Sequence, residues 1–514
     1  MLAGYFCGID YCGMRDIYIL LIVLATSLFI VESPSTWAAN ENSDGENKQK
    51  DFGLAPNPFF IPENARCNDT FPFYHEGIWH LFLMRLPVIA HYVSKDLIQW
   101  QERPIAVEYP GSNMLTGCVV ESKGRFYCFY TFNGISLSIS DDLDHWKKYE
   151  NNPVLTGDDV TYEQSNFRDP YVFFNEEEKI WWMVFCSRMP GQPGQRAGCV
   201  GLAKSKDLIH WEFAKPVWAP MAEPFLECPQ LFKHKDRWYL SMLARHTRCR
   251  VADSLSGPWN RPSIRDMGTL MAHANSRPAT DGKRWISFPF ILVPTERKEL
   301  LANADFLGGP IGIPRQWNFN EDGSVTQRPA DEIISAMHAA CNGARKSLSM
   351  ARVVAGKWEL NDGSIARCVD ESAGTILLDG WPKDFYFEAD VNFSKEDMEC
   401  HVLLNVNEEI SGGYELSLCP RPNMVTLRPL TVWERAQSRV LEMCPIDMAG
   451  NRPIKLRIFR SGTIIEVFVD DRAVLTHRLF QHSGGFLGLE FRDGAGTFSN
   501  ILSCQLAPVN EKDI

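Results

Sequence analysis

The chain is organised around the segment Asn166-Phe167-Arg168-Asp169-Pro170-Tyr171-Val172-Phe173-Phe174, in which an Arg-Asp pair opens an aromatic strand. A charged turn, residues 175–179, follows it, and residues 180–186 read as a second, mostly apolar strand. Charged side chains are seldom placed at the start of a core strand unless something is held there. We therefore predict a β-hairpin that carries a functional acid, Asp169, at its entrance.

The turn and the aromatic strand of this hairpin belong to a unit that recurs five times, at intervals of roughly fifty residues. Its copies are residues 77–82, 124–129, 179–184, 236–241 and 282–287. A second signature is a turn of Ser and Asp followed by Leu and Trp, and it occurs in residues 94–100, 140–146, 205–211 and, more loosely, 252–259. Its apolar side chains can fill the space between neighbouring sheets.

A unit of about fifty residues with several short strands has the size of one propeller blade. Five units therefore predict a five-bladed β-propeller. A long sandwich or two separate sheets would be the alternative, but neither accounts for two signatures that repeat in the same order.

Beyond a short segment with helical character, residues 330–344, the strand pattern changes. In residues 385–393 apolar and polar side chains alternate with a period of two, which is typical of a half-buried strand. Residues 454–458 and 465–469 repeat this style. We expect an antiparallel β-sandwich here. The predicted fold class is thus all-β, a five-bladed β-propeller followed by a C-terminal β-sandwich.

At 514 residues the chain is too long for a single ordinary core. Arg15, an apolar run over residues 17–31 and the small residues Ala38 and Ala39 indicate a secretory signal peptide, with an uncleaved anchor as the alternative. We expect a secreted or periplasmic protein without stable membrane association after signal cleavage. The predicted divisions are a signal peptide in residues 1–39, a flexible leader in 40–54, the catalytic propeller in 55–335, a linker in 336–346 and the sandwich in 347–510.

The composition excludes several classes of function. The formal net charge is -12 and no run is rich in Lys or Arg, so a nucleic-acid partner is not expected. The fifteen cysteines are dispersed, without the close paired spacing of a zinc site. Most of them, such as Cys128 and Cys186 within aromatic strands, are interpreted as small buried apolar residues. No metal and no organic cofactor is expected.

Three acids occupy the same position in three of the repeated units. Asp69, Asp169 and Glu227 each lie ten to twelve residues before a Trp of the aromatic strand that follows. Residues 116–118 and 273–275 take that position in the other two units. Because the first strand of each blade lines the central channel, these positions should form one ring at one mouth of the propeller.

A ring of three carboxylates suits the hydrolysis of a glycosidic bond. Like charges in proximity raise the pKa of at least one carboxyl, which keeps it protonated near neutral pH. One ionised and one protonated carboxyl on either side of a bond are the equipment of a glycoside hydrolase. The alternative is that each acid only caps its own turn. Arg168 is expected to hold Asp169 ionised, or else to contact the sugar.

The motifs at the three acids are Asn68-Asp69, Arg168-Asp169-Pro170 and Glu227-Cys228. Together with stretches at 91–97, 314–329 and 466–469, they resemble those of glycoside hydrolase family 32, the sucrose and fructan hydrolases. The resemblance extends over residues 57–506. The resemblance implies cleavage of β-fructofuranosides such as sucrose, inulin or levan, with retention through a double displacement. It also implies that Asp69 is the nucleophile, Glu227 the general acid/base, and Asp169 the residue that holds sugar hydroxyls. The candidate substrate-binding residues are Asn68, Arg168, Thr116, Cys118 and His273.

The chain departs from the family pattern around the sugar pocket. Thr70-Phe71-Pro72 stand where the family has Pro-Asn-Gly after the nucleophile, and Arg66-Cys67 where it has Trp-Met. Met84 replaces a sugar-binding Gln, and residues 115–118 replace a Trp-Ser-Gly-Ser type loop. These changes indicate an altered substrate. The alternatives are an inverting arabinofuranosidase- or xylosidase-like hydrolase of the related propeller families, and a non-catalytic carbohydrate-binding propeller.

The sandwich is expected to support the propeller and to supply no catalytic acid. Glu466 lies in an alternating strand and Asp470-Asp471 in a turn, and both are interpreted as solvated positions. His401 and Trp433 could contact an extended glycan, although packing is the preferred interpretation of both.

Overall fold

The computed structural model describes residues 53–62, 67–85, 87–109, 115–244, 246–263, 272–273, 277–292, 308–341, 348, 351–361, 364–430, 440–448, 452–480 and 485–508. Strands dominate these residues, and α2 (Asp331–Cys341) is the one α-helix among them, where a helical segment is predicted. No helix in this part of the chain is long and apolar enough to cross a membrane. The predicted signal peptide and most of the predicted leader lie outside the described residues.

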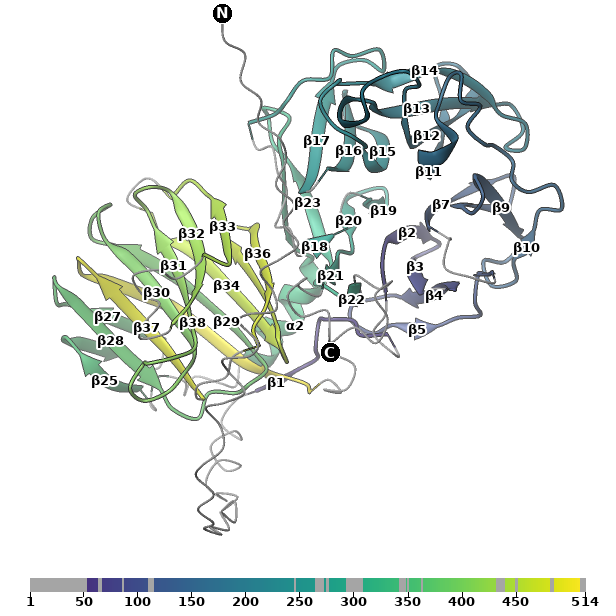
Figure 1. Ribbon diagram of the computed structural model, residues 1–514. Coiled ribbons are helices and arrows are strands. Elements are labelled where there is room, and N and C mark those ends of the chain that lie inside the picture. Colours follow the sequence, from purple (N-terminus) through teal and green to yellow (C-terminus); the bar gives the residue numbers. More distant parts are fainter. Residues whose placement is uncertain are drawn as a thin grey trace, which may run out of the picture. The chain divides into compact units, whose positions relative to one another are not determined.

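Five small antiparallel sheets follow one another along the chain and form the five-bladed propeller that the repeats predict (Figure 1). The first two blades are β2 (Thr70–His75), β3 (Ile78–Arg85), β4 (Val88–Ser94) and β5 (Gln101–Glu102), with β6 (Val107–Glu108) beside β4, and then β7 (Leu115–Ser122), β8 (Arg125–Thr131), β9 (Ile135–Ser140) and β10 (Lys147–Lys148). The third blade is β11 (Arg168–Asn175), β12 (Ile180–Arg188), β13 (Gly198–Ser205) and β14 (Glu212–Trp218), and the fourth is β15 (Glu227–His234), β16 (Arg237–Ala244) and β17 (His246–Ala252). The fifth blade is β19 (Ala279–Thr280), β20 (Trp285–Ser287), β23 (Arg315–Phe319) and β24 (Val325–Pro329). A small extra sheet, β18 (Ala272–His273), β21 (Phe290–Leu292) and β22 (Gly308–Ile311), accompanies the fifth blade.

The innermost strands β2, β7, β11, β15 and β19 follow one another around the central channel. The ring closes where Gln230 Nε2 of β15 donates a hydrogen bond of 2.8 Å to Pro278 O, directly before β19. Thr70 Oγ1 of β2 donates one of 2.5 Å to Phe288 O on the other side of the fifth blade. The repeated aromatic strands of the sequence are the second strands of the blades, β3, β8, β12, β16 and β20.

The second repeated signature forms a turn that inserts a leucine between neighbouring blades. Leu97, Leu143 and Leu208 adopt left-handed backbone angles, with φ of 64°, 67° and 69°, and are almost fully buried. In the first of these turns the Leu97 amide donates to Ser94 Oγ at 2.8 Å, so the serine of the signature fixes the conformation. Leu143 packs with core residues of the first two blades, and Leu208 with those of the second and third. The predicted role of this signature is confirmed.

Most of the described chain after α2 forms two antiparallel sheets, the predicted β-sandwich (Figure 1). One sheet has the order β26 (Trp358–Asn361), β27 (Ile365–Cys368), β38 (Gly496–Leu506), β29 (Phe385–Phe393), β34 (Ile454–Ser461), β35 (Ile464–Val469) and β36 (Arg472–Arg478). The other has the order β25 (Ala351–Ala355), β28 (Ala373–Leu378), β37 (Phe486–Arg492), β30 (Glu399–Val406), β31 (Tyr414–Cys419), β32 (Met424–Pro429) and β33 (Glu442–Pro445). Near the start of the described chain, β1 (Leu54–Ala55) pairs in parallel with the end of β38.

Strand β29 is buried on both faces at its start, and not on one face as its alternation predicts. Phe385 and Phe387 lie in the core between the two sheets. Tyr386 faces the other way but is also buried, because that face of the sheet packs against α2 and the propeller in a shared apolar cluster. An alternating pattern shows which residues share a face, but not whether the second face meets water.

None of the thirteen cysteines in the described part of the chain forms a disulfide, and twelve of them are buried. Their interpretation as small apolar residues is confirmed. His401 is also buried, 1% exposed, and its Nδ1 lies 2.9 Å from Ser417 Oγ. It therefore has a packing role, while Trp433 lies outside the described residues.

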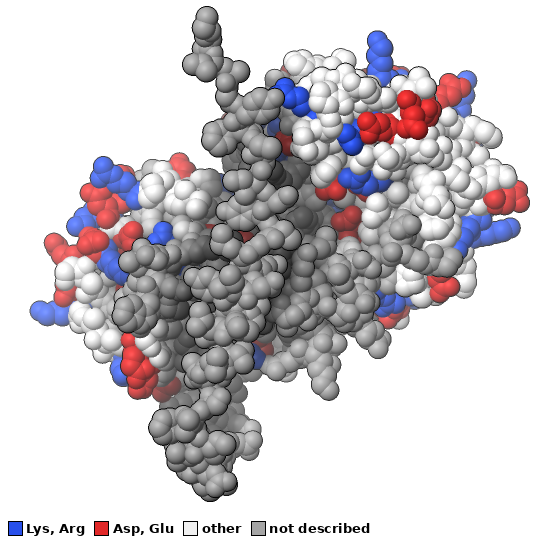
Figure 2. Space-filling view, viewed as in Figure 1, with Lys and Arg blue, Asp and Glu red and all other residues white. Residues whose placement is uncertain are grey.

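Charges of both signs are intermixed on the surface. Figure 2 shows Asp and Glu side chains beside Lys and Arg over the described part of the face that it draws. Exposed ion pairs such as Arg125–Asp141 are screened by water and contribute little to stability. The stability of the fold therefore depends on its buried contacts.

Among the residues that the structure describes, the most deeply buried ion pair joins the propeller to the sandwich and corrects the prediction for Glu466. Glu466 of β35 is 0% exposed, and its Oε1 accepts a hydrogen bond of 2.8 Å from Arg315 Nη2 of β23, a side chain 1% exposed. The Ile313 amide donates to Glu466 Oε2 at 3.1 Å. The prediction of a solvated position was wrong because the outer face of this strand meets the fifth blade. The predicted turn at Asp470-Asp471, directly after β35, is present.

Replacing Glu466 by Ala should strongly destabilise the protein, because it leaves the Arg315 guanidinium buried without its carboxylate. The expected loss in free energy of unfolding is about 3–5 kcal/mol, measured by urea denaturation. Glu359→Ala, which removes an exposed partner of Arg367 in the same sandwich, is the matched control and should change stability by less than about 1 kcal/mol. Similar effects of the two substitutions would contradict the assignment.

Candidate active site

The three acids singled out in the sequence lie at the same end of the central channel. Asp69 directly precedes β2, Asp169 is the second residue of β11, and Glu227 is the first residue of β15. These innermost strands run in the same direction along the channel, because each begins its blade. Residues more than 150 positions apart in sequence therefore meet at one mouth.

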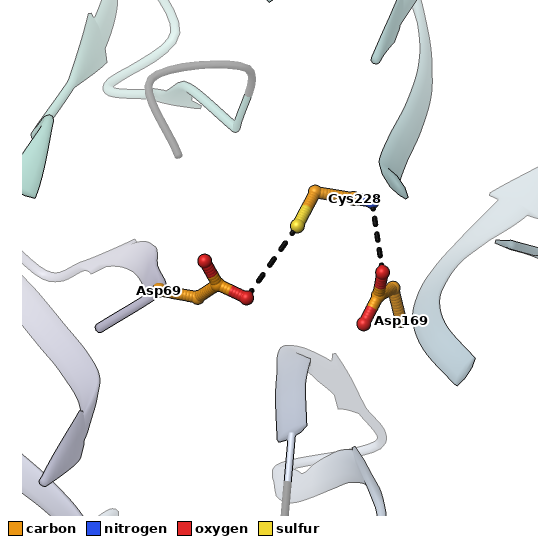
Figure 3. Close-up of side chains that lie close together, drawn as sticks. All are labelled: Asp69, Asp169 and Cys228. Carbon is orange, nitrogen blue, oxygen red and sulfur yellow. Dashed lines mark hydrogen bonds between the residues drawn. The ribbon is translucent and has the colours of Figure 1, made fainter. Parts of the chain in front are cut away.

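Cys228 connects the two aspartates (Figure 3). Its Sγ lies 3.6 Å from Asp69 Oδ2, and its backbone amide donates a hydrogen bond of 3.0 Å to Asp169 Oδ2. One carboxylate oxygen of each aspartate and this sulfur lie within 4.8 Å of one another. The two carboxyl groups are thus close enough to contact one small substrate.

Arg168 links Glu227 to the two aspartates through Asp169. Its Nη2 donates to Glu227 Oε1 at 2.9 Å, and its Nε lies 3.6 Å from Asp169 Oδ2. Its guanidinium also lies over the Phe225 ring, 5.4 Å from the centroid. Arg168 was expected to hold Asp169 ionised, and the structure adds Glu227 as its closer partner.

The backbone is distorted where these side chains leave the inner strands. Asp169 and Cys228 have left-handed φ angles of 60° and 47°, and each lies within a register shift at the start of its strand. Non-glycine residues rarely adopt this conformation, and such bulges re-aim side chains at functional sites. The Asp169 amide donates to Thr131 Oγ1 at 2.9 Å, which holds the distorted segment in place.

Arg277 is a residue of the site region that the sequence analysis missed. It is 2% exposed and donates to backbone carbonyls of two inner strands, to Asp169 O at 2.9 Å, to Pro170 O at 3.2 Å and to Gly117 O. It lies two residues before the two-residue strand β19, where the fifth repeat is weakest, so no signature marks it. It fixes the spacing of β7 and β11.

The predicted substrate-binding residues differ in their burial and in their hydrogen bonds. Asn68 lies beside Asp69, and its Oδ1 is buried without a hydrogen-bond partner. Thr116 is fully buried, and its Oγ1 also lacks a partner. Cys118 lines a channel cavity of about 300 Å³, and its Sγ accepts a hydrogen bond of 3.3 Å from the Val172 amide. Neither Asn68 nor Thr116 lines the cavity that Cys118 lines.

His273 does not take the position that the repeats predict for it. It lies in β18, which pairs with β21 in the extra sheet, whereas the innermost strand of the fifth blade is β19, six residues later. The prediction of equivalence was wrong because this unit contains an additional strand before its inner one. The His273 side chain lies outside the described residues.

Burial and mutual repulsion shift the titration of the acids. Burial raises the pKa of Asp69 to about 7; the charges of Asp169 and Glu227 add to the rise, and Arg277 opposes it. Burial also raises the pKa of Glu227, against the opposing charge of Arg168. The site therefore binds protons near neutral pH that isolated carboxylates would have released, as an acid catalyst requires.

Asp69, Asp169 and Cys228 also have the spacing of metal ligands. Burial raises the pKa of the Cys228 thiol well above its usual value, and the two aspartates add to this rise. A protonated thiol is a poor metal ligand. The protonated Cys228 thiol therefore makes these three residues a poor ligand set in the metal-free site.

The sequence matches two family descriptions, "Glycosyl hydrolases family 32 N-terminal domain" over residues 60–258 and "Glycosyl hydrolases family 32 C terminal" over residues 421–508. An insoluble isoenzyme of beta-fructofuranosidase from Arabidopsis thaliana is 26% identical over 258 residues, and levanase from Bacillus subtilis is 29% identical over 213. These alignments cover 43% and 36% of this chain and 42% and 29% of those proteins, so the chain spans less than half of their length. Sucrose-6-phosphate hydrolase from Zymomonas mobilis is 25% identical over 504 residues, 85% of this chain and 89% of that protein.

Solved structures share the fold. The GH32 beta-fructofuranosidase of Bombyx mori has a TM-score of 0.62 at 17% identity, with coverage of 90% of this chain and 97% of that chain. Fructan 1-exohydrolase IIa from Cichorium intybus has a TM-score of 0.61 at 13% identity and covers 90% and 99%.

Replacing Asp69 by Asn should stabilise the protein at alkaline pH and have little effect at acid pH. Because the folded pKa of Asp69 is raised from 3.8 to about 7, the unfolded state ionises first, and the wild type loses stability as the pH rises between these values. Above pH 7 the variant should be more stable by a few kcal/mol, on the order of 2–4, and near pH 4 the difference should vanish. Thermal unfolding at pH 4, 6 and 8 measures it.

Asp142→Asn is a control with the opposite sign, because a hydrogen bond from His145 lowers the pKa of Asp142. This variant should be less stable than the wild type at pH 8. An Asp69→Asn variant that is less stable than the wild type at pH 8 would show that the carboxyl is not held in a repulsive site.

Proposed function

Because the chain belongs to glycoside hydrolase family 32, we propose that it hydrolyses furanosidic bonds of β-fructofuranosides of the sucrose, inulin or levan type. The observation that carries this proposal is the meeting of Asp69, Asp169 and Glu227 at one mouth of the propeller, connected by Cys228 and Arg168. The names of the relatives, which include beta-fructofuranosidases and levanase, support fructosides as the substrate class.

In the proposed mechanism Asp69 attacks the anomeric carbon of the fructosyl unit, while Glu227 protonates the oxygen of the leaving group. The bond to that oxygen breaks, and a covalent fructosyl ester of Asp69 forms. Glu227 then takes a proton from a water molecule, whose oxygen attacks the anomeric carbon and releases Asp69. Asp169 accepts hydrogen bonds from sugar hydroxyls, as the family resemblance implies. Two displacements at one carbon retain its configuration.

The titration of Glu227 supports its role as the general acid, whereas Asp69 must lose its proton before it can attack. The raised pKa of Glu227 favours the protonated form that a general acid needs. In the empty site the raised pKa of Asp69 keeps part of the nucleophile protonated at neutral pH.

The altered segment after Asp69 favours a changed substrate over lost catalysis. Thr70 and Phe71 are buried in β2, and Thr70 Oγ1 is held by Phe288 O at 2.5 Å, so the segment forms a regular inner strand. Asp69 still lies against Cys228 at 3.6 Å. A nucleophile displaced by about 1 Å could lose roughly a hundredfold in rate, and these contacts argue against such a displacement.

Export is a further part of the proposal. The apolar run over residues 17–31 between Arg15 and Ala38-Ala39 supports a cleaved signal peptide and a secreted or periplasmic protein. Release of the mature protein into the culture medium or periplasm, with an N-terminus near residue 40, is the measurement that checks it.

The wild type should release fructose from at least one of sucrose, inulin and levan. Asp69→Asn and Glu227→Gln should each lower turnover by roughly 10²–10⁴-fold and retain sugar binding, because each removes a reacting group with little change in shape. Glu227→Gln should lose least with an aryl fructoside, whose leaving group needs little protonation. Asp236→Asn, in an exposed turn, is the matched control and should keep full activity.

Unchanged turnover in either variant would remove that residue from the mechanism. Tight glycan binding by a wild type that cleaves no furanoside would favour a binding propeller instead.

Hydrolysis should proceed with retention of configuration. Proton NMR of the first sugar released should show the anomer of the substrate, which then equilibrates, because the covalent intermediate inverts the centre twice. Release of the opposite anomer would favour the inverting mechanism of the related propeller hydrolases.

A further inference from the structure

A cavity of about 250 Å³ lies at one end of the sandwich, between its two sheets. Trp381, Phe385 and Phe486 form aromatic walls, and the polar groups that line it come from Lys383, Asn405 and Arg460. Phe385 and Arg460 are paired neighbours in β29 and β34, while Asn405 and Phe486 belong to the ends of β30 and β37 in the other sheet. None of these residues belongs to the site at the propeller mouth.

Arg460 is buried without hydrogen-bond partners for two of its nitrogens. Its residue exposure is 5%, and neither Nε nor Nη2 has a partner. Buried guanidinium groups are normally paired, because an unpaired buried charge is strongly destabilising. The cavity beside it therefore lies next to an unsatisfied cation.

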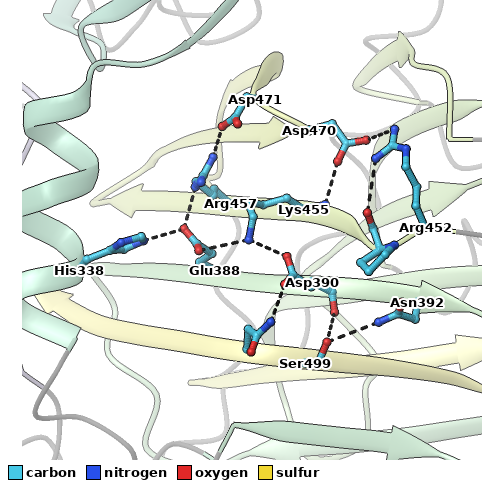
Figure 4. A network of polar contacts seen from close by, with 12 residues as sticks. His338, Glu388, Asp390, Asn392, Arg452, Lys455, Arg457, Asp470, Asp471 and Ser499 are labelled. Carbon is cyan, nitrogen blue, oxygen red and sulfur yellow. Dashed lines mark hydrogen bonds and ion pairs between the residues drawn. The ribbon is translucent and has the colours of Figure 1, made fainter.

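Arg457, three residues earlier in the same strand, shows the usual arrangement. It is 7% exposed, and its Nε donates to Glu388 Oε2 at 2.7 Å (Figure 4). Glu388 also binds His338 of α2 at 3.1 Å, and Lys455 binds Asp390 at 2.6 Å, so the charges of this network are matched. Among the described residues, no ion pair or hydrogen-bond network of this kind involves Arg460.

The acid whose charge acts most on Arg460, Asp384, is engaged elsewhere. Its Oδ1 accepts a hydrogen bond from the Gly462 amide, and no ion pair joins it to Arg460 within the described residues. Burial lowers the pKa of Arg460 to about 10, so the group remains charged at neutral pH although its surroundings disfavour the charge.

We propose that this cavity binds a small oxyanion, a carboxylate or a phosphate, through Nε and Nη2 of Arg460. These two nitrogens form one edge of the planar guanidinium, which matches the spacing of two oxygens of one such group. Lys383 is exposed and lines the same cavity, so it adds a second positive charge near the entrance. The volume of about 250 Å³ limits the ligand to about the size of a monosaccharide, and the aromatic walls would pack on its apolar face.

Isothermal titration calorimetry at pH 7 and constant ionic strength tests the site, with D-glucuronate and inorganic phosphate as probes and D-glucose as the neutral control. The wild type should bind at least one of the anions, and glucose should not bind there. Arg460→Met should bind that anion at least tenfold more weakly. Arg421→Met removes an exposed guanidinium from the same sandwich and should leave binding unchanged.

The two anions separate the possible sources of the ligand. Binding of glucuronate alone would assign a sugar acid, and binding of phosphate alone would assign a phosphate group. Without anions, Arg460→Met should raise the melting temperature, because it removes an unpaired buried charge. Should this variant not fold, Lys383→Gln, at an exposed position, should weaken anion binding severalfold.

Binding of neither anion by the wild type, equal binding by Arg460→Met, or equal binding of glucose would overturn the proposal. So would a fall in the melting temperature of anion-free Arg460→Met, because Arg460 would then be a structural residue. None of these outcomes depends on whether the propeller hydrolyses fructosides.

Discussion

The contact between the fifth blade and the sandwich is the interaction on which the rest of the structure depends. The fifth blade starts with strands of two and three residues, so it has few backbone hydrogen bonds of its own with which to close the ring. Phe288 of this blade packs in one cluster with Met337 of α2 and Phe459 of the sandwich, and the Arg315–Glu466 pair crosses the same contact. The sandwich therefore holds β19 in place. This strand lies beside β2, and the carboxylate of Asp69 directly precedes β2.

At the site itself, repulsion between like charges is balanced by a small number of cations and amides. Arg168 contacts both Asp169 and Glu227, and Arg277 fixes the strands behind them through carbonyl oxygens. Cys228 donates from its amide to one aspartate and lies with its thiol against the other. The charged groups and amide donors of the site are thus in fixed positions before any substrate enters, which is the condition for electrostatic stabilisation of a transition state.

The sequence was most informative where it repeats. Two signatures in fixed order predicted the blades and their second strands. They also predicted the turns that place Leu97, Leu143 and Leu208 between blades, because a repeated local sequence forms a repeated local structure. The shared phase of Asp69, Asp169 and Glu227 likewise placed them at one mouth. Prediction failed where a residue depends on packing between distant segments. The burial of Glu466 requires knowledge of what covers its strand, and the place of His273 was lost because its unit contains an additional strand.

The pairing of β1 with β38 has a consequence for how the chain is made. Leu54 of β1 pairs with Gln505 of β38. The ribosome therefore makes β1 before the propeller, and makes its partner strand about 450 residues later. At ribosomal rates of roughly 5–20 residues per second, the first strand waits roughly 20–90 seconds for its neighbour. The propeller must therefore fold as a loop between the two halves of this pairing. Such a long closure makes the final docking of the sandwich slow, and chaperones have time to act on the half-finished chain.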